Sequence, residues 1–91
     1  MAETVQRRAE DRVEVIHRAQ MRVERDTLSY PVTVRNLSTQ GMMGEGPVPL
    51  SSGTRLTVSL PDQGEVAGTV VWVQKPRFGV AFDRSVDPSF A

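Results

Sequence analysis

Apolar and polar residues alternate in segment after segment of this chain. Between Val13 and Val23 the apolar side chains occupy almost every odd position, and Leu56–Leu60 and Phe78–Phe82 repeat the same two-residue period. A period of two is typical of a β-strand with one buried face, because successive side chains of a strand point to opposite sides. The sequence therefore predicts a chain built mainly of half-buried strands.

About six short strands are expected along the chain. Besides the three segments above, strands are predicted at Tyr30–Val34, from Met42-Met43 onward, and at Val66–Val73. This pattern favours a small all-β barrel or sandwich, and closing the sheet would remove its exposed edges. The predicted connections are rich in Gly, Pro, Asn, Asp or Ser, which favour turns; they are Arg25–Thr27, Asn36–Gly41, Gly44–Gly53, Pro61–Gly64 and Lys75–Arg77.

The length of 91 residues fits a single domain. We expect residues 1–12 to form an N-terminal arm, either flexible or a short helix, because no strand period is visible there. Residues 13–84 are expected to form the β-domain and residues 85–91 a C-terminal tail. Among the aromatic residues, Trp72, Phe78 and Phe82 fit core positions of their strands.

The composition argues against catalysis and against a metal site. The chain has no cysteine and one histidine, which excludes a disulfide scaffold, a thiolate zinc site and a multi-histidine metal site. That histidine, His17, falls on the apolar register of the first strand, so a structural role is expected. No serine lies in a nucleophile elbow and no carboxylate pair has a spacing suited to acid–base work. We therefore expect no catalytic residue, no metal and no cofactor.

Charge and hydropathy restrict the partners and the location. Eleven Lys and Arg residues balance eleven Asp and Glu residues, so the formal net charge is zero. Duplex DNA or a long RNA requires a strongly basic face, so neither is expected as a partner. The apolar stretches are too short to span a membrane, and the first residues lack the apolar core of a secretory signal. These features predict a cytoplasmic protein without membrane insertion.

Two clusters are candidates for ligand binding. The first holds Arg7, Arg8 and Arg12, three guanidinium groups within six residues directly before the first strand. Guanidinium is planar, permanently charged and able to bind phosphate oxygens or the guanine O6/N7 edge in a bidentate way. The second cluster, Asn36-x-Ser38-x-x-Gly41, combines turn-forming polar residues with a glycine that permits positive φ or close approach. Each cluster alone is compatible with a solvated arm or a plain turn.

The two clusters together, in this order and before this strand pattern, resemble the PilZ domain family. That family has an RxxxR motif near its start and a (D/N)xSxxG motif after its second strand, which Arg8–Arg12 and Asn36–Gly41 match. The likeness covers roughly residues 6–83, because three later segments resemble the later strands of the family: Gly53–Leu60, Gly68–Val73 and Phe78–Phe82.

The resemblance implies a six-stranded antiparallel β-barrel that binds the bacterial second messenger cyclic di-GMP. It further implies a stand-alone, non-catalytic receptor that passes the signal to a separate protein partner of unknown identity. The ligand-binding residues carried over are Arg7, Arg8, Arg12, Asn36, Ser38 and Gly41.

The roles of these residues follow from the same resemblance. Arg8 and Arg12 would grip the phosphates and guanine edges, with Arg7 as a third contact. Asn36 and Ser38 would hydrogen-bond a guanine or its neighbouring phosphate. Gly41 would let the backbone turn tightly beside the ligand.

Two other functions remain open from the sequence. The chain could be a PilZ-like adaptor that binds a protein partner and no nucleotide. It could also be a small OB-like nucleic-acid-binding barrel, although that fold predicts exposed stacking aromatics. The oligomeric state is expected to be a monomer or a weak dimer.

Overall fold

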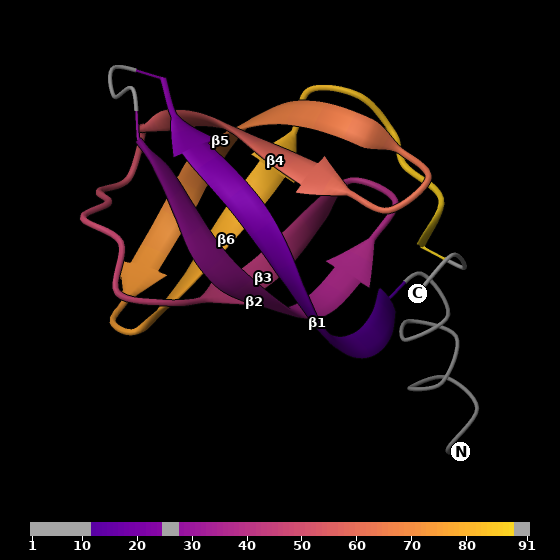
Figure 1. The fold of residues 1–91 in the computed structure, drawn as a ribbon, viewed down its shortest axis with the longest axis horizontal. Helices are drawn as coiled ribbons and strands as arrows, with labels where there is room; N and C mark the ends of the chain where they lie inside the picture. Colours follow the sequence, from indigo (N-terminus) through magenta and orange to yellow (C-terminus); the bar gives the residue numbers. More distant parts are fainter. Residues whose placement is uncertain (1–11, 25–27, 89–91) are drawn as a thin grey trace, which may run out of the picture.

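The computed structural model describes residues 12–24 and 28–88, with only the backbone described for residues 12–17. Six strands make up its regular structure within these ranges (Figure 1). They are β1 (Arg12–Val23), β2 (Ser29–Ser38), β3 (Gly41–Glu45), β4 (Arg55–Leu60), β5 (Gly64–Gln74) and β6 (Arg77–Phe82).

The strands form one closed barrel in the order β1-β2-β3-β6-β5-β4. All neighbouring pairs are antiparallel, and β1 closes the barrel by pairing Met21, Arg22 and Val23 with β4. The predicted all-β, six-stranded antiparallel barrel is therefore confirmed, and the sandwich is excluded. Each of these strands is hydrogen-bonded on both sides, so the described sheet has no free edge.

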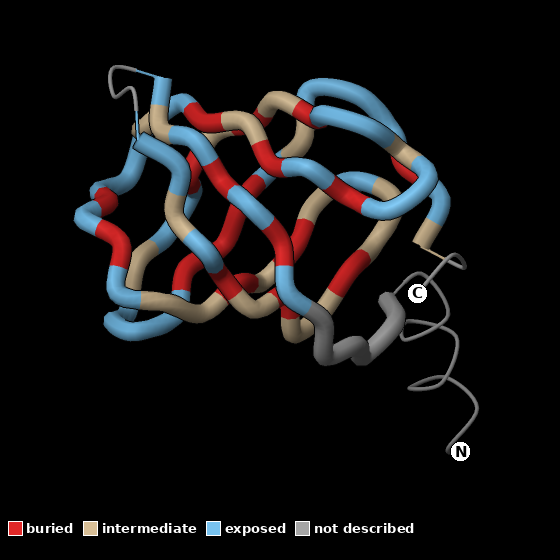
Figure 2. Tube along the Cα trace, in the orientation of Figure 1, coloured by how far each residue is buried: buried red, intermediate tan, exposed pale blue. Residues whose placement is uncertain are grey.

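The barrel interior is filled by aliphatic side chains and one large aromatic ring. Phe78 is 2% exposed, and no polar or charged residue among the described side chains is buried. Buried residues alternate with exposed ones along the strands (Figure 2). Each fully buried aliphatic side chain contributes about 1.5–3 kcal/mol of transfer free energy. The central ones are Met21, Val32, Val34, Leu37, Leu56, Val58, Val66 and Val70.

The strand register shifts in three places: in β1 between Glu14 and His17, in β2, and in β5. The bulges of β2 and β5 involve described side chains. In β2, Val34 pairs with Gly44 and Asn36 pairs with Met43. Gly44 and Met43 are adjacent in β3, so Arg35 is an extra residue of β2. In β5, Val70 pairs with Val80 and Trp72 pairs with Gly79, so Val71 is an extra residue. A bulge shifts the side-chain alternation by one position.

The bulges explain two differences from the sequence predictions. Asn36 and Ser38 were expected in a turn, but they belong to the last residues of β2, with Leu37 buried between them. Trp72 was expected in the core, but it is 39% exposed, because the bulge turns it outward and brings Val73 against the core instead. Phe78 is buried and Phe82 packs against the core, as predicted.

The segment after β6 is anchored to the barrel. Val86 is 5% exposed, and its N–H donates to the Thr39 carbonyl at 2.9 Å. The Phe82 N–H donates to the Gln40 carbonyl at 2.8 Å. Residues 83–88 thus pack across the β2–β3 connection, so the predicted tail begins as an ordered segment.

Two further predictions concern the N-terminal part and the membrane. Of the predicted arm of residues 1–12, residues 1–11 lie outside the described residues, and Arg12 is the first residue of β1. His17 lies in β1, where its Cα pairs with that of Val34, and its side chain also lies outside the description. In the described part of the chain, no helix has the length and apolar character needed to cross a membrane.

Candidate functional site

The barrel brings the second predicted cluster beside the start of β1. Asn36 and Ser38 lie near the end of β2, and Gly41 is the first residue of β3. In the β1–β2 ladder the Cα of Arg12 pairs with that of Ser38, and Glu14 pairs with Asn36. Strand pairing therefore places Arg12, the last residue of the RxxxR segment, beside Ser38 of the Asn36–Gly41 motif, where β1 runs next to β2 (Figure 1). Arg7, Arg8 and the side chain of Arg12 lie outside the description.

A surface cavity of about 460 Å³ lies over this junction. Its volume is in the range of small-molecule sites, about 300–1,000 Å³. Four strands supply its walls: residues of β2, β3, β5 and β6 meet there with the β2–β3 connection. The lining residues include Asn36, Ser38, Gln40, Gly41, Met43, Trp72 and Gly79.

The two bulges orient the polar and aromatic side chains of this cavity. Val32 and Val34 face the core, and continued alternation would send Asn36 inward as well. The extra residue Arg35 reverses this, and its Nη1 is held by Glu45 Oε1 at 2.8 Å. The corresponding extra residue of β5 turns Trp72 outward. The bulges of β2 and β5 thus orient side chains that line the same cavity.

Ser38 stabilises the connection between β2 and β3. Its hydroxyl donates to the Gly41 carbonyl at 3.2 Å and accepts the Gln40 N–H at 3.3 Å. A serine hydroxyl has one donor and two acceptor positions, so one acceptor position stays open. The side-chain amide of Asn36, in contrast, makes no hydrogen bond within the described ranges, and it can both donate and accept.

Gly41 is required for strand packing rather than for a special backbone angle. A Cβ at this position would overlap the carbonyl oxygen of Val80 in the neighbouring strand. Among the described glycines, positive φ occurs at Gly53 and Gly64, and not at Gly41. The glycine of the motif therefore lets β3 approach β6 closely.

Trp72 is the cavity residue that the sequence pattern missed. Its indole lies where a Cβ of Gly79 would be, so it covers the backbone of the paired strand. The run Val70–Val73 is apolar throughout and has no alternation from which a face could be assigned. The useful sequence signal was Gly79, because a strand glycine often marks close approach by another group.

The described wall of the cavity is electrically neutral. Every lining residue is an amide, a hydroxyl, a glycine or an apolar side chain. These lining residues therefore hold no cation for an anionic ligand, and the predicted cationic cluster consists of Arg7 and Arg8 before β1 and Arg12 at its first position. No group of three or more His, Cys, Asp or Glu among the described residues is placed to hold a metal ion.

The perturbed titrating pair of the described chain lies elsewhere. Arg55 donates to both carboxylate oxygens of Asp83, at 2.9 and 2.6 Å. These hydrogen bonds lower the pKa of Asp83 and raise the pKa of Arg55. Neither residue lines the cavity, so the pair is a structural clamp between β4 and the segment after β6.

Comparison with known proteins places this barrel in a family. The PilZ domain matches residues 6–89, which include both clusters and all six strands. The chain belongs to the PilZ domain family. No curated protein matches the sequence. PilZ domains form a family of cyclic di-GMP-binding domains that are generally non-catalytic receptors.

Proposed function

We propose that this PilZ domain binds cyclic di-GMP at the 460 Å³ cavity and passes the signal to a protein partner without catalysis. The observation that carries the proposal is the junction of the two motifs. Asn36, Ser38 and Gly41 line one cavity, and the backbone of Arg12 is paired directly with Ser38.

The charges of the ligand suit the arginines before β1 and at its first position. Cyclic di-GMP has two phosphates and two guanines, and the described wall of the cavity offers no cation. Arg8 and Arg12 would bind phosphate oxygens or guanine O6/N7 edges, with Arg7 as a third contact. Binding would tie the segment before β1 to the barrel and create the surface that a partner recognises.

The neutral groups would recognise the bases. The amide of Asn36 can accept from guanine N1–H or N2–H and can also donate to a phosphate oxygen. Ser38 would accept one further hydrogen bond while it keeps the turn closed. The exposed indole of Trp72 offers a flat surface on which a guanine can stack, an interaction worth about 1–3 kcal/mol per base.

Calorimetry with cyclic di-GMP tests this proposal directly. We expect binding by the full chain, and we expect Arg8→Ala to weaken it about tenfold or more, since charge-assisted hydrogen bonds contribute about 1.5–3 kcal/mol each. Arg22→Ala is the matched control, because Arg22 is an exposed arginine of β1 that does not line the cavity. GMP is the control ligand.

Tryptophan fluorescence gives an independent readout. Trp72 is the only tryptophan of the chain, so its emission should change on titration with cyclic di-GMP. Absence of heat and of a fluorescence change at high micromolar ligand would overturn the proposal and favour the adaptor that binds no nucleotide.

A further inference from the structure

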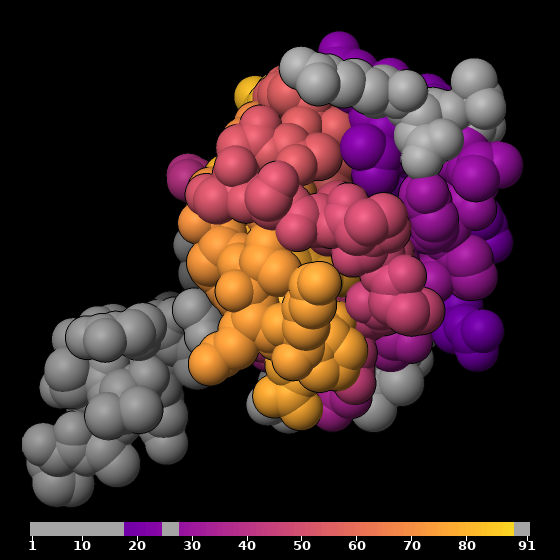
Figure 3. Space-filling view, turned by 90° about the vertical axis from the view of Figure 1, so that its left-hand side faces the viewer, coloured from indigo at the N-terminus to yellow at the C-terminus, as the bar shows by residue number. Residues whose placement is uncertain are grey.

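A second, larger cavity lies at the other end of β2 and β3. Its volume is about 670 Å³, and residues 30–35 and 45–48 supply most of its lining. Figure 3 looks onto this end of the barrel, where segment 46–54 lies between the strands β1 and β2 and the β5–β6 turn. We call this cavity the Tyr30 groove. It shares no lining residue with the cavity that holds Asn36 and Ser38.

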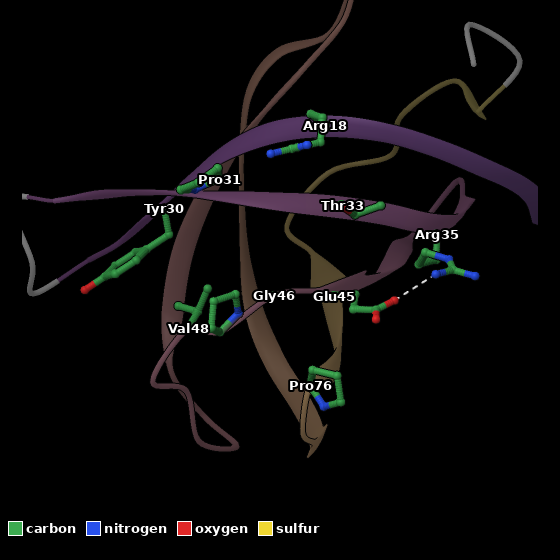
Figure 4. A pocket seen from close by; sticks show the side chains of 10 residues that line it. Arg18, Tyr30, Pro31, Thr33, Arg35, Glu45, Gly46, Val48 and Pro76 are labelled. Atoms are coloured by element: carbon green, nitrogen blue, oxygen red, sulfur yellow. Dashed lines mark hydrogen bonds and ion pairs between the residues drawn. The ribbon is translucent and has the colours of Figure 1, made fainter.

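One side of the Tyr30 groove is apolar. Tyr30 packs partly against the core, and Val48 is 6% exposed at the base of the loop (Figure 4). Three prolines complete this side: Pro31, Pro47 and Pro76. Proline offers no backbone N–H, and every described strand already has two neighbours, so an added β-strand has nowhere to pair. An occupant must therefore be held through its side chains.

The other side of the groove is charged, with an excess of arginine. Glu45 Oε1 is 2.8 Å from Arg35 Nη1 and 3.9 Å from Arg77 Nε. Arg18 also lines the groove, is exposed, and forms no ion pair with any side chain that the structure describes. Of these residues, Arg18, Arg35 and Glu45 line the groove, so its lining carries one guanidinium in excess, and Arg18 can bind a further carboxylate.

We propose that the Tyr30 groove docks an extended segment of a partner protein that carries an apolar side chain next to one or two carboxylates. The apolar side chain would lie against Tyr30 and Val48, and a carboxylate would bind Arg18. Grooves that bind extended or proline-rich peptides commonly combine aromatic and apolar contacts with a few fixed polar groups, and the lining of the Tyr30 groove offers both kinds of residue. This docking site goes beyond nucleotide binding and does not depend on it.

The chemistry of the groove favours a peptide over a nucleic acid. Glu45 stands inside the groove and would repel a phosphate backbone. The chain as a whole has no net positive charge with which to attract a polyanion. A single carboxylate beside an apolar anchor needs only the local excess of arginine.

Selection from a random ten-residue peptide library displayed on phage, against the full-length protein without nucleotide, tests this proposal. We expect enrichment of Asp or Glu close to Leu, Pro or an aromatic residue. The selected peptides should bind Arg18→Glu about tenfold or more weakly, since charge reversal removes one attraction and adds a repulsion. Arg22→Glu should bind them normally, because it carries the same change on the same exposed face of β1, outside the groove.

A second variant and a second measurement guard against a misfolded mutant. Pro47→Glu places a repelling charge on an exposed loop residue of the groove and should also weaken the peptides. Both groove variants should keep the affinity of the wild type for cyclic di-GMP, which separates this test from that of the proposed function. If nucleotide binding is absent altogether, circular dichroism establishes folding and the peptide test stands alone.

Several results would overturn the docking site. They are the absence of any enriched sequence, enrichment of neutral or basic peptides, and peptides that bind Arg18→Glu and Arg22→Glu equally well. Binding of a single-stranded oligonucleotide that is lost in Arg18→Glu would also overturn it, in favour of a nucleic-acid surface.

Discussion

The side chains of β4 and those around the cavity that holds Asn36 and Ser38 follow different patterns. In β4, Leu56, Val58 and Leu60 are buried and their neighbours are not, without interruption. In β2 and β5, an extra residue reverses the alternation partway along each strand. The regular strand β4 contributes to the core, whereas the bulged strands β2 and β5 turn polar and aromatic side chains toward the cavity. This difference shows that the barrel forms this cavity by local departures from the alternation that folds it.

Each bulge behaves as an inserted residue. If Val71 is left out of β5, then the buried residues Val66, Gly68 and Val70 and the partly buried Val73 become one alternating inward-facing set, with Trp72 on the opposite face. The bulge therefore changes which sequence positions face outward without changing the buried face of the strand. Bulges next to functional sites commonly re-aim side chains in this way.

The largest effect should come from deleting single residues in the two kinds of strand. Deletion of Thr57 moves the remaining side chains of β4 to the opposite face, which should remove most of the roughly 5–15 kcal/mol that stabilises a domain. Deletion of Val71 removes only the extra residue, so a cooperatively unfolding barrel should remain. Urea denaturation followed by circular dichroism measures both. Equal loss of folding in the two deletions would contradict the interpretation of Val71 as an insertion.

The regular part of the fold could be predicted from the sequence, for a physical reason. Strands such as β4 and β6 bury one face, so apolar and polar residues alternate along their sequences and predict the strand. The closed order of the strands and the register with β1 depend on pairing between distant segments, which no local pattern contains. The anchoring of Val86 likewise depends on a backbone hydrogen bond to a distant carbonyl.

The candidate site was predictable only in part. Asn36, Ser38 and Gly41 stood out because their spacing matches a motif, and the structure brings them to one cavity. The outward face of Trp72 could not be predicted, because a bulge is set by cross-strand register and an all-apolar run hides it. The reason for Gly41 was also missed, because close approach by Val80 comes from the neighbouring strand.

The second largest effect should be the loss of stacking at the bulged strand β5. Trp72→Ala should weaken cyclic di-GMP binding by about 1–3 kcal/mol, which is roughly 5- to 150-fold in Kd. Its effect on stability should be smaller than that of Leu56→Ala, which creates a core cavity and costs about 2–5 kcal/mol. Calorimetry and urea denaturation separate the two quantities.

Trp72→Phe is the matched control for this change. It keeps an aromatic face and should recover part of the affinity. If Trp72→Ala binds as tightly as the wild type, the indole is a cover for Gly79 and not a platform for the base.

A smaller change should follow from substituting Asn36 by its acidic counterpart. If Asn36 accepts from guanine N1–H and N2–H, Asn36→Asp should tighten binding by several-fold, because charge-assisted hydrogen bonds are about twice as strong as neutral ones. If Asn36 donates to a phosphate, the same change should weaken binding by like-charge repulsion. Asn36→Ala should weaken binding in either case, and unchanged calorimetry for both variants would remove Asn36 from the site.

The smallest effect should come from Asp83, which forms an ion pair with Arg55 of the regular strand β4. Arg55 lowers the pKa of this carboxyl below its ordinary value of 3.8, mainly through hydrogen bonds. A lowered pKa in the folded state means that the pair stabilises the barrel above that ordinary value, and that this contribution is lost as pH falls through the folded-state pKa. Asp83→Asn should therefore lower stability near neutral pH, and the difference from the wild type should shrink in acid. Both residues are exposed, which keeps the effect small.

The control for Asp83 is a carboxylate of the β4–β5 turn. Asp62→Asn changes the net charge equally but leaves the Arg55–Asp83 ion pair intact. Subtracting the pH dependence of its stability therefore isolates the contribution of that ion pair. Cyclic di-GMP affinity should stay unchanged in both variants, because neither residue lines the cavity. A loss of affinity in Asp83→Asn alone would show that the clamp beyond β6 also positions the β2–β3 connection, to which Val86 and Phe82 are hydrogen-bonded. The regular strand β4 would then help to shape the cavity between the bulged strands β2 and β5. The residues that stabilise the barrel and those that line the cavity would be less separate than their alternation patterns indicate.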